Sequence, residues 1–268
     1  MALYDHEGTR GLAPSSILGQ PPGTLSPKFV MSTRRFFSSH PFTGNTLRLN
    51  GDEYHHLKNV NRAKRGDPVE VIDGQGSLFC GEIQSMKSDE ALVLVQKIEK
   101  SPKPPVKVIV APSLLKQHPM NVMIEKLTEI GVDEIRPVMF TRTDETYSPT
   151  RLKKWNRIAS QSLKVNKRLW LTDIYPPVSI EQILEMSQSI KTKILLDIPG
   201  QNPGNAAWQF PVIAVIGPPG DITAEEREIL LQNGFIPYKI NDAVLKSETA
   251  AISIGAILKY ASGSQKPF

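Results

Sequence analysis

The residues best suited to chemistry lie in a loop near the C-terminus. An apolar run, Val212–Ile216, ends in Gly217-Pro218-Pro219-Gly220-Asp221, and a helical pattern follows. Glycines in such a loop allow the backbone to approach a ligand closely. The same residues are also compatible with a tight turn and nothing more. The loop lacks both Gly-x-Gly-x-x-Gly and Gly-Lys-Ser/Thr, so it disfavours dinucleotide and triphosphate binding.

The elements around this loop predict where it sits in a fold. Thr223 and Glu226 have the spacing of a capping box, which predicts a helix start directly after the loop. A second strand is predicted over Phe235–Ile240, and it runs into an irregular stretch, Asn241–Ala250. Two successive parallel strands end at the same edge of a sheet, which is where α/β proteins bind ligands.

Composition bounds the class of protein. The chain has 268 residues, 40% of them hydrophobic, which is enough for one large or two modest domains. Its single cysteine, Cys80, permits no internal disulfide and favours a reducing compartment, so we expect a soluble protein of the cytoplasm or of an organelle. No Cys/His cluster suggests a metal site, and no apolar run reaches the length of a membrane span.

Positive charge is concentrated in two stretches. Seven Lys/Arg against two acids lie between Arg34 and Arg65, and seven Lys/Arg with no acid lie between Arg151 and Arg168. Such clusters often serve only solubility. Two of them in one chain favour a polyanionic partner.

The sequence divides into three parts. Residues 1–33 are rich in Pro and Gly and show no periodicity, which indicates a flexible leader. Residues 34–100 carry short β patterns, Thr46–Leu49, Pro68–Ile72, Leu78–Ile83 and Ala91–Val95, with one helical segment over Gly51–Ala63, and predict a small β-barrel. Three prolines within 102–105 mark a linker.

Residues 106–268 alternate between strand and helix patterns. The predicted order is strand Val106–Ala111, a helix ended by Gly131, strand Glu134–Phe140, helix Pro149–Lys167, strand Leu169–Ile174, helix Ser179–Met186, strand Lys193–Leu196, and the stretch described above with a final helix, Ala251–Tyr260. This alternation predicts an α/β domain with a mostly parallel sheet covered on both sides.

Four motifs in this order resemble those of a known family. They are Arg34-Arg35-Phe36-Phe37, Lys126-Leu127-Thr128-Glu129-Ile130-Gly131-Val132 with Pro137, the loop Gly217–Asp221, and Leu245-Lys246-Ser247-Glu248-Thr249-Ala250. They are similar to the motifs of the ribosomal RNA small subunit methyltransferase E family, SPOUT-class enzymes that methylate N3 of a uridine in small-subunit (16S-type) ribosomal RNA. In that family the glycine loop ends in Gly or Asp.

The resemblance implies a fold and a cofactor. It implies a PUA-like β-barrel that binds RNA, and a SPOUT domain whose C-terminal strands and loops form a deep trefoil knot. It implies a homodimer that uses S-adenosyl-L-methionine and acts on small-subunit ribosomal RNA, free or in an assembled subunit. The cofactor would lie against the loops Leu196–Gly200, Ile216–Asp221 and Ile240–Ser247.

The resemblance also suggests residues for each role. The expected cofactor-binding residues are Leu196, Asp197, Ile198, Ile216, Gly217, Pro218, Gly220, Asp221, Ile240, Val244, Leu245 and Ser247. The expected RNA-binding residues, all in the first basic stretch, are Arg34, Arg35, His55, Lys58, Arg62, Lys64 and Arg65. His55 and His56 are neighbours on a predicted helix and therefore point apart, which favours RNA contact or a solvated surface over a ligand pair.

Methyl transfer to a ring nitrogen suggests which side chains take part. The reaction is an in-line displacement that needs alignment and a deprotonated base, and no metal. Cations stabilise the developing anion, so Arg142 is the first candidate and Lys246 the second, although Arg142 is equally compatible with an ordinary surface role. Glu248 is a third candidate, with a helix-start carboxylate as the plainer interpretation.

Departures from the family pattern leave alternatives open. Pro219 replaces a Glu, Ala243 replaces an Arg, and Lys246 replaces an Arg whose bidentate fork it lacks. A methyltransferase-like RNA-binding protein without activity is therefore the second hypothesis. A nucleotide-binding enzyme of doubly wound topology is the third, and it ranks last because the turn Ala111–Leu115 has no glycine.

The final helix bears on the oligomeric state. Ala251–Leu258 is apolar on nearly every side, and such a helix is normally buried all round. One side of a terminal helix is expected to face a partner subunit, with Gly255 and Ala256 allowing close approach. The alternative is a helix wholly internal to a monomer.

Overall fold

The computed structural model of this chain describes residues 34–42, 44–202 and 208–263. The predicted leader, 1–33, lies outside the described residues. From Arg34 onward the described residues form one compact unit. Among them, no helix combines the length and the apolar character needed to cross a membrane.

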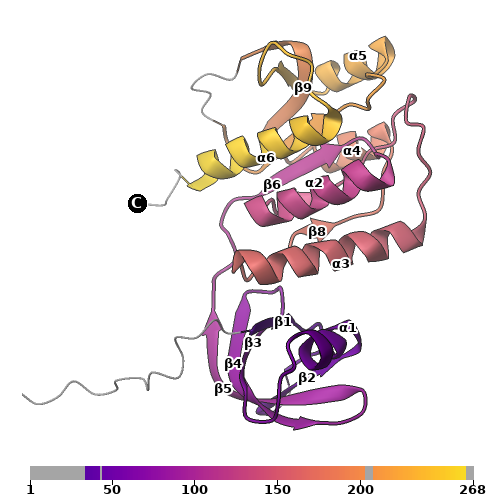
Figure 1. Cartoon of the computed structure of the whole chain (residues 1–268). Helices are drawn as coiled ribbons and strands as arrows, with labels where there is room; N and C mark the ends of the chain where they lie inside the picture. The colour runs from indigo at the N-terminus through magenta and orange to yellow at the C-terminus, as the bar shows by residue number, and fades with distance from the viewer. Residues whose placement is uncertain (1–33, 43, 203–207, 264–268) are drawn as a thin grey trace, which may run out of the picture. The chain divides into compact units, whose positions relative to one another are not determined.

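The first part of this unit is a five-stranded sheet that curls around its own core (Figure 1). Its spatial order is β1-β3-β4-β5-β2, formed by β1 (Arg34–Phe37), β2 (Thr46–Asn50), β3 (Pro68–Ile72), β4 (Ser77–Met86) and β5 (Glu90–Lys100). The four predicted strands are present. A further strand, β1, was not predicted from the sequence, and it pairs in parallel with β3. The predicted helix is present as α1 (Gly51–His55), continued by a π-helical turn, His56–Val60.

The second part is a six-stranded sheet with parallel pairings throughout. Its order is β11-β9-β10-β6-β7-β8, and its strands are β6 (Val108–Pro112), β7 (Glu134–Ile135), β8 (Asp173–Ile174), β9 (Thr192–Gln201), β10 (Val212–Ile216) and β11 (Ile236–Tyr238). The helices between them are α2 (Gln117–Ile130), α3 (Pro149–Asn166), α4 (Ile180–Met186), α5 (Ala224–Gln232) and α6 (Ser247–Gly263). The predicted α/β class is therefore confirmed. The trefoil knot and the domain boundaries stay predictions.

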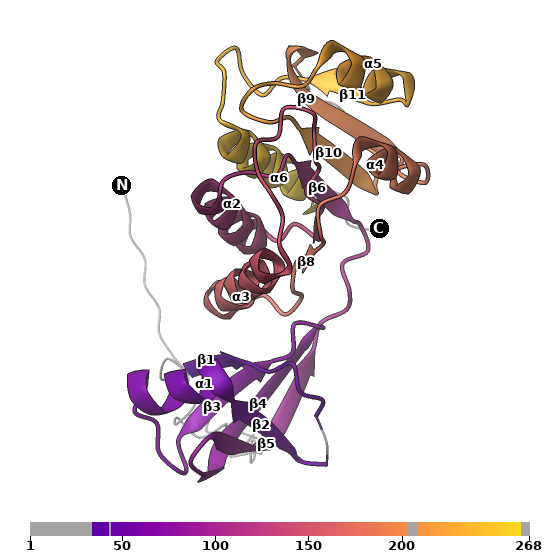
Figure 2. The same ribbon diagram turned by 90° about the vertical axis from the view of Figure 1, so that its right-hand side faces the viewer.

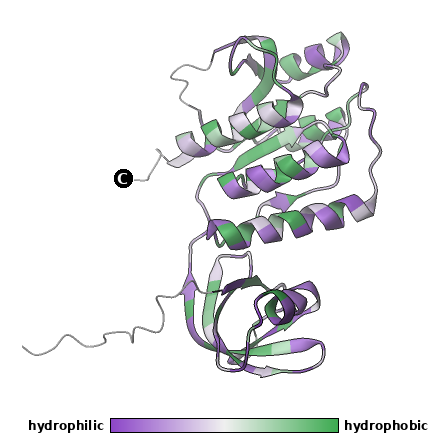
Figure 3. Ribbon diagram, in the orientation of Figure 1, coloured by the Kyte–Doolittle hydropathy of each residue, from purple (hydrophilic) through white to green (hydrophobic). Residues whose placement is uncertain are grey.

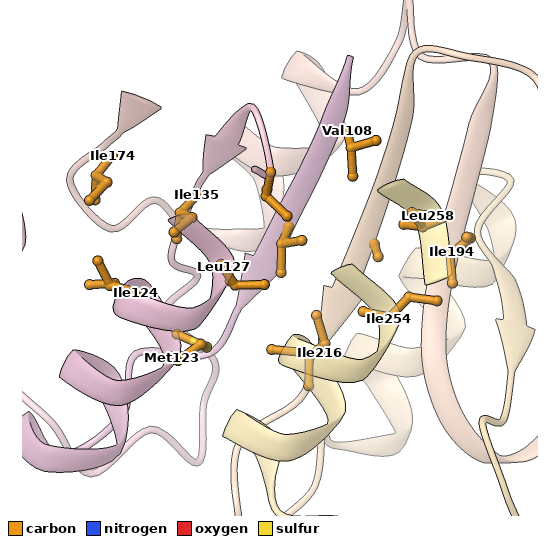
Figure 4. Packing of buried hydrophobic residues seen from close by; sticks show 14 of the residues in the cluster. Val108, Met123, Ile124, Leu127, Ile135, Ile174, Ile194, Ile216, Ile254 and Leu258 are labelled. Atoms are coloured by element: carbon orange, nitrogen blue, oxygen red, sulfur yellow. The ribbon is translucent and has the colours of Figure 1, made fainter. Parts of the chain in front are cut away.

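Helices cover both faces of this sheet (Figure 2). One core cluster joins the sheet to α2, α3 and α6 and includes Leu127, Trp155 and Ile254 (Figure 4). A second cluster on the opposite face includes Ile183 of α4 and Leu230 of α5. All five residues of β10 are buried, as expected for a central strand packed on both faces.

Prolines account for two strands that are shorter than predicted. The expected strand Glu134–Phe140 is regular only over β7, because Pro137 has no N–H to donate, and pairing resumes as isolated bridges at Val138. The expected strand Phe235–Ile240 is reduced to β11, where the register shifts at Pro237. In contrast, α6 begins at Ser247, earlier than predicted, so the end of the expected irregular stretch is helical.

Glycines are needed at two positions next to the core cluster that includes Leu127. Gly131 ends α2 in the left-handed region at φ 87°, the conformation in which glycine is favoured. Gly255 lies in the middle of α6, where an added Cβ would come within 2.6 Å of Leu127 Cδ2 and 3.2 Å of Val132 Cγ2. The absence of a side chain at Gly255 thus serves packing inside the chain.

This packing yields a stability prediction. We expect Gly255→Val to lower the free energy of unfolding by about 1–3 kcal/mol, because the new side chain overpacks a closed core. Urea denaturation measures the change. Gly263→Val is the matched control on the same helix, since a Cβ there meets nothing within 4 Å. An equal loss in both variants would show that helix propensity, and not the contact with Leu127, governs the effect.

Candidate functional site

A pocket of about 670 Å³ opens at the carboxyl ends of β10 and β11 and along the second half of β9. Leu196–Gly200, which the sequence predicted as a loop, is part of strand β9. Parallel pairing brings these three segments together, because β9 pairs with both β10 and β11. The volume lies within the usual range for small-molecule sites. The lining residues are Leu196–Pro199, Ile216–Pro219, Asp221, Ile222, Tyr238–Asn241, Ala243–Glu248 and Ala250.

Eleven of the twelve expected cofactor-binding residues line this pocket; Gly220 does not. A Cβ at Gly220 would meet only Arg142, at 3.8 Å, which is an ordinary contact. A Cβ at Gly217 would lie 3.0 Å from Ile222 Cγ2, so a side chain there would crowd the pocket wall. Gly217 is therefore the position of this loop at which a side chain would make the tighter contact.

Hydrogen bonds hold the glycine loop, Gly217–Asp221, in a defined shape. The Asp221 N–H donates to the Pro218 carbonyl at 3.0 Å, and the Asp221 carboxylate accepts the Ile222 N–H at 2.8 Å. Asp221 adopts the left-handed region at φ 65°, which Asp tolerates better than most residues. From α6, the Ser247 hydroxyl donates to the Gly217 carbonyl at 2.9 Å. The loop is thus tied to the helix that forms the opposite wall.

The three catalytic candidates lie around this loop. Lys246 and Glu248 line the pocket at the start of α6. Arg142 does not line it; its Nη1 donates to the Gly220 carbonyl at 3.0 Å, from the loop that follows β7. The structure thus brings Arg142 against the glycine loop, 78 residues away in sequence.

Five lining residues fall outside the three loops expected from the sequence. Glu248, a catalytic candidate, and Ala250 belong to the motif that begins at Leu245. Ile222, Tyr238 and Lys239 belong to no motif, and only their position next to a predicted loop could have suggested them. Asp197, an expected cofactor residue on β9, has its carboxylate in an ion pair with Arg227 of α5 at 2.6 Å.

The structure separates the expected RNA-binding residues into two groups. Arg34 pairs with Asp67 at 3.2 Å, and Arg35 pairs with Glu70 at 2.7 Å with its side chain only 12% exposed. These two arginines are engaged within the first sheet. Arg62, Lys64 and Arg65, by contrast, are exposed together in the turn before β3.

His55 and Lys58, the two expected RNA-binding residues of the first helical segment, lie close together. His55 contacts Asn59 at 2.9 Å, and the Lys58 ammonium lies 5.5 Å from the centre of the Tyr54 ring. His55 and Lys58 also line a second, smaller pocket with Asp89. They are therefore accessible to a ligand.

The second basic stretch is only partly an open surface, although hydrophilic segments run along α3 in Figure 3. Arg151 donates to the Leu115 carbonyl at 2.5 Å, and Lys164 pairs with Glu53 at 2.6 Å. Arg168 donates to the carbonyls of Ile130 and Gly131, and burial lowers the pKa of its guanidinium. These three cations stabilise the fold, whereas Lys153 and Lys154 are exposed.

In the part of the chain that the structure describes, no group of three or more His, Cys, Asp or Glu side chains could hold a metal ion. The pocket offers apolar walls with a few polar groups, which suits an organic ligand.

Comparison with protein families identifies the class of this chain. A family model for the RNA methyltransferase domain matches residues 102–259, more than half of the sequence. The chain belongs to the RNA methyltransferase family. A model for the PUA domain of RNA methyltransferases matches residues 49–96, within the five-stranded sheet. Membership of the RNA methyltransferase family favours the first two hypotheses over a nucleotide-binding enzyme of doubly wound topology.

Individual relatives extend the similarity over most of the chain. The ribosomal RNA small subunit methyltransferase E of Synechocystis sp. is 26% identical over 232 residues, covering 84% of this chain and 76% of that protein. The protein of the same name from Bacillus subtilis is 23% identical, covering 87% and 95%. The crystal structure of ribosomal RNA small subunit methyltransferase E from Neisseria gonorrhoeae, bound to S-adenosyl methionine, superposes with a TM-score of 0.78 at 21% identity and covers 85% and 97%, which shows a shared fold.

Proposed function

We propose that this protein transfers a methyl group from S-adenosyl-L-methionine to N3 of a uridine in small-subunit ribosomal RNA. The observation that carries the proposal is the pocket at the ends of β10 and β11 and along β9, which is lined by eleven of the twelve expected cofactor residues in a chain of the RNA methyltransferase family. Relatives of similar length are named for methylation of small-subunit ribosomal RNA. The reaction would take place where ribosomes are assembled, in the cytoplasm or in an organelle.

The pocket residues suit S-adenosylmethionine. Gly217 keeps one wall flat, because its missing side chain leaves room beside Ile222. Ile216, Leu196 and Val244 offer apolar surface for a base, and Asp197, Asp221 and Ser247 offer polar atoms for hydroxyl or amino groups. When bound, the cofactor supplies an electrophilic methyl on a positively charged sulfur.

The protein has to prepare the uridine for attack. The bond from sulfur to methyl breaks as the bond from N3 to methyl forms, and N3 must first lose its proton. Arg142 and Lys246 are the cations of the set, and either would stabilise the N3 anion electrostatically. Glu248 lies in the first turn of α6, where the helix dipole favours a carboxylate, so its catalytic role needs a direct test.

The RNA would be held by the first part of the chain. Arg62, Lys64 and Arg65 are exposed together, and the adjacent Lys58 and His55 extend the positive surface. Cations of this kind contact phosphates and position a nucleic acid without reading its sequence. We also propose that Arg34 and Arg35 contribute mainly through their ion pairs with Asp67 and Glu70.

We further propose that the protein is a homodimer that pairs through α6. Ile254 and Gly255 face the core of their own chain, so the contact surface is the opposite side of the helix. That side presents the exposed Ala256 and the partly exposed Ile252, whereas Ile257 lies on the same side as Ile254 and packs against the core. Apolar residues on an outer helix face favour a second subunit as their cover.

The cofactor assignment predicts a loss of binding. Gly217→Val should weaken S-adenosylmethionine binding by at least about 100-fold, equivalent to about 2.7 kcal/mol, because the side chain crowds the pocket wall. Isothermal titration calorimetry measures the dissociation constant. Gly220→Ala is the control, and we expect unchanged affinity because residue 220 does not line the pocket and a Cβ there makes only an ordinary contact with Arg142. Tight binding by a folded Gly217→Val protein would refute the pocket assignment.

The RNA surface predicts a change in salt dependence. Replacing Arg62, Lys64 and Arg65 with Ala should weaken binding to every RNA sequence and reduce the slope of log K against log salt by up to about three. The control replaces Lys87, Lys97 and Lys126, which pair with glutamates, and lowers the net charge equally. If both triple variants behave alike, overall charge and not a defined surface binds the RNA.

The dimer predicts a mass. Light scattering at micromolar concentration should give about twice the monomer mass of 29.7 kDa. Ala256→Glu should return the monomer mass without unfolding the chain, because residue 256 is exposed. Val165→Glu on α3, also at an exposed apolar position, is expected to leave the dimer intact. A monomeric wild-type protein would overturn the proposal.

Methyl transfer itself separates the two remaining hypotheses. Pro219 and Ala243, the main departures from the family pattern, both line the pocket. Wild-type protein, labelled S-adenosylmethionine and small-subunit RNA or subunits should give labelled N3-methyluridine. Binding of both ligands without transfer would favour an RNA-binding protein that has lost activity.

A further inference from the structure

Glu226 is a buried carboxylate in α5 that does not line the pocket. Its side chain is 6% exposed, and it is the third residue of the helix. One carboxylate oxygen, Oε2, accepts the Thr223 N–H at 2.8 Å, and the Thr223 hydroxyl accepts the Glu226 N–H at 3.1 Å. These two bonds are the capping box that the sequence predicts.

The other oxygen makes a contact that no local pattern requires. Oε1 accepts the N–H of Thr141 at 2.6 Å, across 85 residues of sequence. Thr141 begins the short loop Thr141–Thr143, which carries Arg142. A single carboxylate thus connects the helix that follows the glycine loop to the loop that carries the leading catalytic candidate.

The remaining contacts of this short loop explain why that connection matters. The Thr143 hydroxyl accepts the Phe140 N–H at 3.0 Å and lies 3.1 Å from the Ser113 hydroxyl. Arg142 reaches the Gly220 carbonyl at 3.0 Å. With Thr141 held by Glu226, the backbone is fixed on both sides of Arg142, and its guanidinium is directed to the glycine loop.

Electrostatics favour the ionised form of Glu226. Burial alone would raise the pKa of its carboxyl, but the N–H groups of Thr223 and Thr141 outweigh burial and lower the pKa. Its contribution to stability is therefore present above the ordinary pKa of Glu and is lost as the pH falls through the lowered value. At neutral pH both oxygens act only as acceptors.

The capping box of α4 shows that an amide side chain is sufficient for capping. In α4, the Ser179 N–H donates to the side chain of Gln182 at 3.0 Å, and this box is complete with an amide. Glutamine would serve a capping box at position 226 equally well. Only a carboxylate offers acceptors to Thr223 and Thr141 at the same time, because an amide presents one oxygen and one donor.

We infer that Glu226 is a positioning residue for methyl transfer, which holds the Thr141–Thr143 loop against the glycine loop and so orients Arg142 toward the substrate base. This inference rests on the proposed function. Glu226 touches neither pocket nor substrate, so it acts through Arg142 and leaves cofactor binding to the residues that line the pocket.

The decisive variant is Glu226→Gln. Its amide oxygen can still accept the Thr223 N–H and keep the capping box, but its NH2 group then faces the Thr141 N–H, so the bond to Thr141 is lost. We expect kcat for RNA methylation to fall by about 10- to 100-fold, the range for a small misplacement of a reacting group. The dissociation constant for S-adenosylmethionine should stay within about two-fold, since Thr141–Thr143 does not line the pocket. Gln182→Glu is the matched control on α4, with kcat unchanged.

Two further measurements separate positioning from simple stability. Hydrogen exchange should speed up at the Thr141 amide of Glu226→Gln and remain slow in the core strand β10. In a double-mutant cycle, Arg142→Ala should abolish most of the effect of Glu226→Gln, because one acts through the other.

The outcomes are distinct. A folded Glu226→Gln protein with the kcat of the wild type would overturn the positioning role. So would a double variant in which the losses of kcat from Glu226→Gln and Arg142→Ala simply add. A wild-type protein that binds S-adenosylmethionine but methylates no RNA would overturn the proposed function instead.

Discussion

Parallel pairing of the central strands is the constraint on which the site depends. Backbone hydrogen bonds align Val212–Ile216 of β10 with β6 on one side and β9 on the other. Because all three strands run the same way, the second half of β9, the loop that follows β10 and the stretch that follows β11 lie at one edge. A break in this pairing would disperse the pocket walls, even if every loop kept its own conformation.

Patterns that depend on neighbouring residues could be predicted from the sequence. The strand Val212–Ile216, the end of α2 at Gly131 and the capping box of α5 are all present, because each depends on residues a few positions apart. Strand lengths were less predictable where a proline interrupts the ladder, as at Pro137 and Pro237. The edge strand β1 was missed, since only four residues of sequence mark it.

Contacts between distant residues account for most of what the sequence left open. The sequence suggested Arg142 as a catalytic candidate, but it could not reveal that this arginine contacts the Gly220 carbonyl. Arg35 and Lys164 belong to the two basic stretches that suggested a polyanionic partner, yet each forms an ion pair within the fold. The capping role of Glu226 was visible, whereas its bond to Thr141 depends on two loops that meet only in three dimensions. Gly220 and Gly217 look alike in sequence, and only the position of Ile222 distinguishes them.

The left-handed conformation of Asp221 limits how this loop can diverge over evolution. At φ 65° most side chains would strain the backbone, whereas glycine carries no penalty and Asp only a small one. The family resemblance includes loops that end in either of these two residues, and the backbone explains why both persist. Position 220 has no left-handed φ, and a Cβ there makes only an ordinary contact with Arg142. Backbone geometry at residue 221 therefore restricts the side chains that this loop accepts, whatever ligand it holds.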